Sequence, residues 1–259
     1  MTLELATRIN PHIVPLGQLL NSNPAYQYKV PIFQRPYAWS DLQVQPFLED
    51  IDAALKNDKP YYYLGSMVLI EEENDCLRII DGQQRLATTQ ILISRIMNRL
   101  LTIGVPDNTI MRFANYLEHD DESGQRRDTL VLNDTDRKFF SDHVIKRQEI
   151  SDRRISVSSN AAIADAMDTV DEFIEAKYQM LKTTDELRNY LSALVAYINR
   201  NVAVLRVICS DLNFGYTLFR SLNARGKDLG PVDIIRNHIF EHTASDPSTC
   251  RRSAIMGHF

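Results

Sequence analysis

The segment LRIIDGQQRLATTQ contains the residue types of an anion-binding turn. An apolar strand is expected to end at Ile80, and Asp81 and Gly82 are expected to turn the chain into a helix. Free backbone N–H groups at a helix start, together with the helix dipole, can hold phosphate oxygens, and a glycine lets a ligand approach the backbone. An Asp–Gly turn is also common before any helix, so the sequence allows both a phosphate site and a purely structural turn.

Three polar residues come directly after Gly82 in the sequence. Arg85 would lie in the first helical turn, where its planar guanidinium could bind a phosphate in a bidentate manner. Asp81 could hold Mg²⁺ or polarise a water molecule, and Gln83 and Gln84 could orient that water or a sugar. The chemistry that these residue types allow is the binding of a phosphate group, with or without Mg²⁺.

The turn is expected to lie among both helices and strands. Ser40 and Gln43 fit a capping box, and apolar residues follow them at helical spacing. A second helix is predicted from Gln84 to Leu101, ended by Gly104. The acidic run from Glu71 to Asp75 is typical of a hairpin loop. Short β-rich runs are found at Tyr28 to Phe33, Tyr62 to Ile70 and Leu77 to Ile80.

Beyond Pro106 the apolar pattern is mostly helical. The run from Val202 to Ile208 is β-branched and predicts a buried strand that returns to the first sheet. Helices are predicted at Asn108 to Leu117, Asp134 to Ile145, Ala161 to Leu181, Glu186 to Asn199, Phe214 to Leu222 and Val232 to His242. The fold class expected is α+β, with a small mixed sheet, the DGQQR residues at a strand-to-helix turn, and a mainly helical region after it.

These patterns suggest four segments. We expect an α/β core over residues 1–104, a helical region over 105–200, a strand and helices returning to the core over 201–242, and an irregular tail over 243–259. That tail suggests a chain cut from a longer protein or a truncated reading frame.

Composition sets further limits. The 259 residues are 44% hydrophobic and 24% charged, with neither a membrane-length apolar run nor a signal-peptide core, so a cytoplasmic location without membrane contact is expected. Cys76, Cys209 and Cys250 lie far apart, which predicts reduced structural thiols. Neither zinc nor haem is expected as a cofactor.

The net charge of −5 argues against a surface that binds nucleic acid everywhere. Two basic doublets, Arg126–Arg127 and Arg153–Arg154, could line a DNA groove if the fold brings them together; the alternative is solvated surface.

Two further pairs, one of histidines and one of aspartates, are weaker candidates for site residues. His238 and His242 have a spacing that would allow one metal ion, but no third ligand is evident. Asp50 and Asp52 could extend an acidic site, but the helical pattern puts Asp52 on the solvent face and Asp50 at its edge.

Four segments resemble, in order, the motifs of GmrSD-type restriction-endonuclease N-terminal domains. They are VPIFQRPYAW (30–39), YYLGSMVLI (62–70), IIDGQQRLATTQ (79–90) and YTLFRSLNARGKDLGPVDIIRN (216–237). The resemblance implies a core similar to the ParB and sulfiredoxin fold, nucleotide binding at Asp81, Gly82, Gln83, Gln84 and Arg85, and a role in restriction of modified DNA.

The resemblance also implies a second group of site residues. Gln34 and Arg35 could contact phosphate or base, and Tyr37 and Trp39 could stack on a base or on DNA. For Trp39 the alternative is a core position beside the helix after Ser40. The late motif adds Asn223, Arg225 and Gly226 as nucleotide-binding candidates, with a helix C-cap and a surface arginine as the alternative.

The function expected is therefore Mg²⁺-dependent binding and hydrolysis of a nucleoside triphosphate (NTP) in a defence system. A non-catalytic sensor of modified DNA is the alternative, and an inactive truncated fold is a third possibility. Many relatives continue into an HNH nuclease domain, and the chain ends soon after Asn237 without a His-Asn-His cluster. Nuclease activity would have to come from a missing segment or a partner chain.

Overall fold

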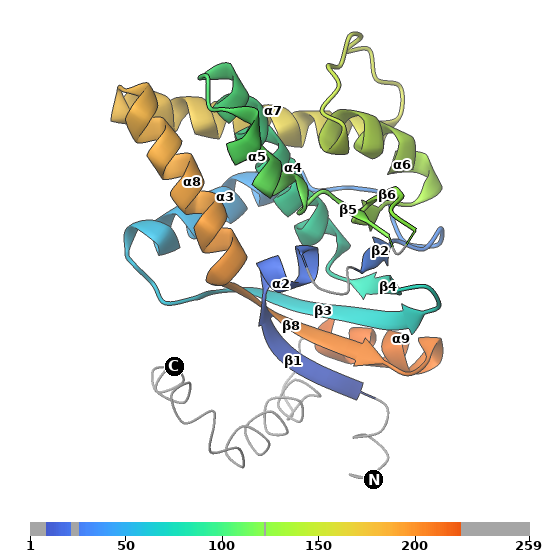
Figure 1. Ribbon diagram of the computed structural model, residues 1–259. Helices are drawn as coiled ribbons and strands as arrows, with labels where there is room; N and C mark the ends of the chain where they lie inside the picture. The colour runs from blue at the N-terminus through green and yellow to red at the C-terminus, as the bar shows by residue number, and fades with distance from the viewer. Residues whose placement is uncertain (1–8, 22–25, 122, 224–259) are drawn as a thin grey trace.

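The computed structural model describes residues 9–21, 26–121 and 123–223 (Figure 1). Within them lies a six-stranded mixed sheet in the order β1-β8-β3-β4-β2-β7. The strands are β1 (Ile9–Pro15), β2 (Gln27–Lys29), β3 (Tyr62–Glu72), β4 (Cys76–Asp81), β7 (Leu130–Val131) and β8 (Val202–Cys209). A separate two-stranded hairpin consists of β5 (Glu118–Asp120) and β6 (Arg126–Asp128).

The long strand β3 organises this sheet. It pairs antiparallel with β4 through a tight hairpin and parallel with β8, which arrives from far along the chain. β1 pairs antiparallel with β8, while β2 runs parallel to both β4 and β7. The predicted return of the segment after residue 200 to the first sheet is confirmed, and so is the α+β class.

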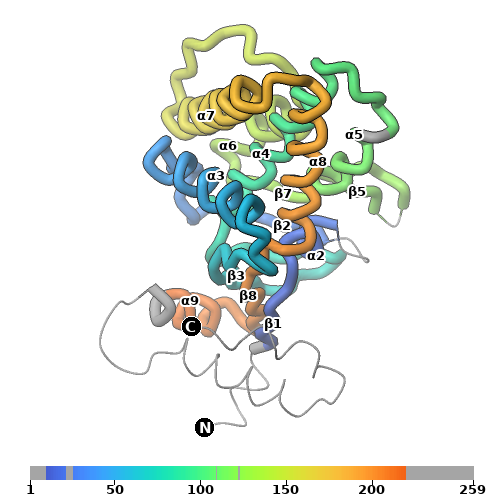
Figure 2. Tube along the Cα trace, turned by 90° about the vertical axis from the view of Figure 1, so that its left-hand side faces the viewer, coloured from blue at the N-terminus to red at the C-terminus, as the bar shows by residue number. Residues whose placement is uncertain are grey.

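Helices cover both faces of the sheet unequally (Figures 1 and 2). The thicker layer contains α2 (Leu16–Leu20), α3 (Asp41–Lys56), α4 (Gln83–Thr102), α5 (Asp107–Ala114), α6 (Asp134–Phe140), α7 (Ser158–Leu181) and α8 (Thr184–Arg200). A π-helical turn, Ser141–Ile145, continues α6. On the opposite face α9 (Leu212–Asn223) packs against Val68, Ile80 and Val207 in a second, smaller core.

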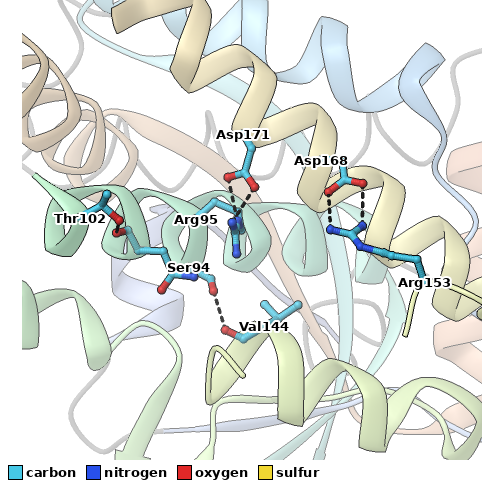
Figure 3. A network of polar contacts seen from close by, with 8 residues as sticks. Ser94, Arg95, Thr102, Val144, Arg153, Asp168 and Asp171 are labelled. Atoms are coloured by element: carbon cyan, nitrogen blue, oxygen red, sulfur yellow. Dashed lines mark hydrogen bonds and ion pairs between the residues drawn. The ribbon is translucent and has the colours of Figure 1, made fainter. Parts of the chain in front are cut away.

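Helix α4 is the centre of the thicker layer. Even its polar residues Gln90 and Ser94 are fully buried, and each donates to a backbone carbonyl, at Tyr116 and Val144 respectively. At its surface Arg95 forms two hydrogen bonds of 2.8 and 2.6 Å with Asp171 on α7 (Figure 3). Oε1 of Gln90 is buried without a partner among the described residues. The hydrogen bonds of Gln90 and Ser94 and the contact of Arg95 with α7 hold α4 in its place in the layer.

Some elements differ from the sequence-based expectation. The strand predicted over 28–33 ends at Lys29, because Pro31 begins a turn in which the Gln34 N–H donates to the Pro31 carbonyl at 3.0 Å. The region predicted to be helical also contains the short strands β5, β6 and β7. Very short strands leave little periodicity, which explains why the pattern missed them.

Candidate functional site

The turn between β4 and α4 has the expected geometry. β4 ends at Asp81, and Gly82 adopts a left-handed conformation with φ 101°. A Cβ at Gly82 would lie 2.6 Å from Cγ of Met67, so both the backbone angle and the space require glycine. The first helical bond runs from the Leu86 N–H to the Gly82 carbonyl. Across the described ranges, the backbone N–H groups of residues 83 to 85 find no hydrogen-bond partner.

The two glutamines of this turn bind a distant stretch of backbone. Gln83 donates from Nε2 to the Arg35 carbonyl at 3.0 Å. Gln84 donates to the Pro36 carbonyl at 3.2 Å and accepts the Ala38 N–H at 2.9 Å. Both side chains are only 8% exposed. Their geometry therefore attaches the segment Gln34–Ala38 to the start of α4.

Replacing Gln84 tests this attachment. Gln84→Ala is expected to lower the free energy of unfolding by about 2 kcal/mol, because two largely buried backbone groups lose their partners. The measurement is chemical unfolding monitored by circular dichroism. Gln179→Ala, at an exposed position on α7, is the matched control and should change it by less than about 0.5 kcal/mol. Equal effects in both variants would refute the attachment.

The same segment is held from its other side by an acidic group that the sequence did not single out. Asp136 is 1% exposed and accepts the Tyr37 N–H at 2.7 Å and the Ser159 hydroxyl at 2.5 Å. Asn133 caps α6 and donates to the Gln34 carbonyl at 3.2 Å. An Asn followed three residues later by an Asp is a signal that could have marked this helix start, but it carries no information on the long-range partners.

A cavity of about 10 Å³ lies between this segment and α4, lined in part by Gln83, Arg35 and Asp136. That is room for about one water molecule, so it is not a nucleotide pocket. Oε1 of Gln83 is buried there and has no partner among the described residues. The Arg35 guanidinium is exposed, and no ion pair or hydrogen bond engages it within the described ranges. The small cavity therefore leaves no room for a large ligand between this segment and α4.

Arg85 is fixed by the neighbouring strand β3. Its guanidinium donates to the carbonyls of Leu64 at 3.3 Å and Ser66 at 2.6 Å, and to the Asp81 carboxylate at 3.2 Å. The side chains of Arg85 and Asp81 remain 22% and 23% exposed. Gly65, which has φ 125°, leaves the space that the guanidinium occupies. The guanidinium is held in one place, with part of its surface open to solvent.

Tyr37 and Trp39, expected as stacking residues with the core as the alternative for Trp39, lie in or against the main core. Tyr37 is 4% exposed, and its hydroxyl lies 2.8 Å from Thr88 Oγ1. Burial raises the pKa of this phenol. The ring of Trp39 packs edge-on against Phe47, with centroids 5.9 Å apart, in the main core. The buried ring of Tyr37 leaves no face for a base, and for Trp39 the geometry favours the core alternative.

A different aromatic pair is accessible. Phe33 is 57% exposed and its ring lies 5.8 Å from that of Tyr216 on α9. This contact brings together the first and last of the four motifs. Sequence reasoning missed Phe33 because it was assigned to the predicted strand.

Asp50 and Asp52 lie in different environments on α3. Asp52 is 6% exposed, so its expected position on the solvent face was wrong; Lys177 and Tyr190 cover it from α7 and α8. Asp50 is exposed and accepts the Tyr62 hydroxyl at 3.1 Å. The side chain of Asn223 and all of Arg225, Gly226, His238, His242 and Cys250 lie outside the described residues.

Over residues 9–21, 26–121 and 123–223, no group of three or more His, Cys, Asp or Glu side chains is arranged to hold a metal ion. The same ranges contain no helix with the length and apolar character needed to span a membrane.

The fold and the turn define a class: an α+β protein in which a strand–glycine–helix turn brings together backbone N–H groups, a carboxylate and a guanidinium. The family model of the GmrSD restriction endonuclease N-terminal domain matches residues 16–240, and the chain belongs to this family. Membership indicates a component of a restriction or phage-defence system. No curated protein matches the chain.

Proposed function

We propose that the outer side of the turn from Asp81 to Arg85 binds a nucleoside triphosphate and hydrolyses it within a restriction system. The observation that supports this is the row of three N–H groups, residues 83 to 85, without partners among the described residues at the start of a 20-residue helix. Aligned peptide dipoles make such a helix start favourable for anions, and phosphate oxygens are acceptors that match N–H donors.

Two arginines supply the charge that a triphosphate needs. A guanidinium has five N–H donors, and the three contacts of Arg85 leave two for a ligand. Arg35 is exposed, and the N–H donors of its guanidinium have no partner among the described residues. Because the carbonyls of β3 already hold Arg85, little side-chain entropy is lost when phosphate binds.

Asp81 is the residue that would hold Mg²⁺. Mg²⁺ sites in nucleotide-binding proteins use one or two carboxylates together with substrate phosphates, so a single carboxylate at the turn fits a metal that arrives with the nucleotide. Bound there, Mg²⁺ would neutralise charge on the phosphates. Asp81 pairs with Arg85 at 3.2 Å, so binding would exchange this contact for the ion and the phosphates.

Phosphate release tests the proposal. ATP, GTP, CTP and UTP are each incubated with Mg²⁺ and the protein, and then with the variants Asp81→Asn and Arg35→Ala. We expect each variant to lower the hydrolysis of the preferred nucleotide by about tenfold, the loss of one charge-assisted contact. Arg188→Ala removes an exposed cation on α8 and serves as the control. Hydrolysis unchanged in both site variants would contradict the assignment.

A further inference from the structure

A polar cleft lies away from the nucleotide turn, beside the hairpin β5–β6. Its volume is about 320 Å³, within the range of ligand sites. In Figure 1 the hairpin lies beneath α6, close to β2. The lining residues are Gln27, Arg126, Arg127, Asp128, Val131 and Arg137. Three arginines and one aspartate thus line this cleft.

A fourth cation, Lys29, lies next to a residue that lines this cleft. Gln27 and Lys29 lie two residues apart on β2 and point to the same side of the sheet, and Lys29 is in register with Val131 of β7. Lys29 and Arg137 are both exposed, and neither side chain has a hydrogen bond or ion pair with another described residue. Unpaired cations at a cleft can bind an anion without first breaking a protein contact.

The hairpin holds its two arginines differently. Arg126 is 3.6 Å from Glu118, which is half-buried, and 3.5 Å from the exposed Asp120, and both contacts are long and therefore weak. Arg127 pairs with Asp121 at 2.6 Å. Hydrogen bonds from Ser123 and Gln125 fix that carboxylate in the turn. Arg127 is therefore positioned, whereas Arg126 is free to move toward a ligand.

Both arginines of the second basic doublet have acidic partners. Arg153 forms two hydrogen bonds of 2.7 and 3.1 Å with Asp168 on α7 (Figure 3), and Arg154 pairs with Asp152 at 2.9 Å. Neither arginine lines the cleft. The two doublets have the same composition, but Arg126–Arg127 lines this cleft together with the unpaired Arg137, whereas Arg153–Arg154 does not.

We infer that this cleft binds backbone phosphates of a nucleic acid. A guanidinium can donate two parallel hydrogen bonds to the oxygens of one phosphate. The described residues that line the cleft include no aromatic side chain on which a base could stack. Contacts of this kind hold a strand in position without reading its sequence. A free phosphate compound presents the same chemistry, so the experiment must separate the two sources. The inference does not depend on the proposed nucleotide site.

The test uses the whole chain without nucleotide or Mg²⁺. Binding of a fluorescent duplex of about 20 base pairs is followed by anisotropy between about 50 and 200 mM salt. We expect the double variant Arg126→Ala/Arg137→Ala to bind about tenfold more weakly at low salt and to reduce the slope of log K against log salt by about 2, one for each lost phosphate contact. The control Arg153→Ala/Arg154→Ala has the same net charge as Arg126→Ala/Arg137→Ala, because each variant loses two arginines. It should bind the duplex like the unmodified chain.

Three outcomes would overturn the inference. They are equal weakening in both double variants, unchanged binding in Arg126→Ala/Arg137→Ala, and absence of duplex binding by the unmodified chain. Pyrophosphate, as the probe for free phosphate compounds, is titrated separately by calorimetry. If it binds in an Arg137-dependent manner while the duplex does not bind, the cleft belongs to a small phosphate compound instead. Thermal unfolding of each variant confirms that its fold is retained.

Discussion

Gly65→Ala is expected to lower the free energy of unfolding by about 3 kcal/mol. Gly65 has φ 125°, and an added Cβ would lie 1.9 Å from Nη1 of Arg85. The flexible guanidinium can move away, but it then loses its contacts with Leu64, Ser66 and Asp81. Backbone strain and lost hydrogen bonds therefore add together, and nucleotide hydrolysis at the proposed site should fall with them.

Gly104→Ala is the matched control for this prediction. Gly104 also has positive φ, at 80°, but an added Cβ would meet no atom within 4 Å. Only the backbone strain of about 1 kcal/mol is expected. Urea unfolding of both variants measures the difference. If Gly65→Ala costs no more than Gly104→Ala, then Arg85 does not depend on the space beside β3.

Local patterns predicted the elements that carry the candidate site. The β3–β4 hairpin, the glycine turn and α4 were all expected, because strand alternation, acidic turn residues and a long apolar stripe are properties of neighbouring residues. The return of β8 to the sheet also followed from a short β-branched run. Gly104, expected to end α4, does follow its last turn with positive φ.

Side-chain partners could not be predicted in the same way. The partners of Gln83 and Gln84 are carbonyls and an N–H group near residue 36, almost fifty positions earlier. A glutamine that binds backbone and one that binds a ligand look identical in sequence. Tyr37 shows the same limit, because its burial depends on Asp136 and Thr88, which reach it from α6 and α4.

Asp52 provides the clearest case, since only the packing of three helices explains its burial. Nζ of Lys177 lies 2.5 Å from its carboxylate and Nζ of Lys56 lies 2.9 Å away, while the Tyr190 hydroxyl donates at 2.7 Å. Lys177 is itself 12% exposed and lies over the rings of Phe173 and Tyr190. The carboxylate thus links α3, α7 and α8.

Asp52→Ala is expected to lower the free energy of unfolding at neutral pH by about 3 kcal/mol, because Lys177 would remain buried without its partner. Urea unfolding measures the loss. Asp50→Ala, two residues earlier on the same helix and exposed, should cost less than about 1 kcal/mol. A similar cost for both variants would show that the cluster around Asp52 contributes little to stability.

The stability that Asp52 contributes should also depend on pH. Burial alone would raise its pKa, but hydrogen bonds from Lys177, Lys56 and Tyr190 outweigh burial and hold the pKa below its ordinary value of 3.8. A lowered folded-state pKa means that the contribution is fully present above the ordinary value and is lost as the pH falls through the lowered one. The difference in unfolding free energy between the unmodified chain and Asp52→Ala should therefore be constant from pH 7 to about pH 5 and shrink below about pH 4. A difference that instead grew on acidification would mean that the carboxyl is protonated in the fold and that its lysine contacts do not stabilise the charged form.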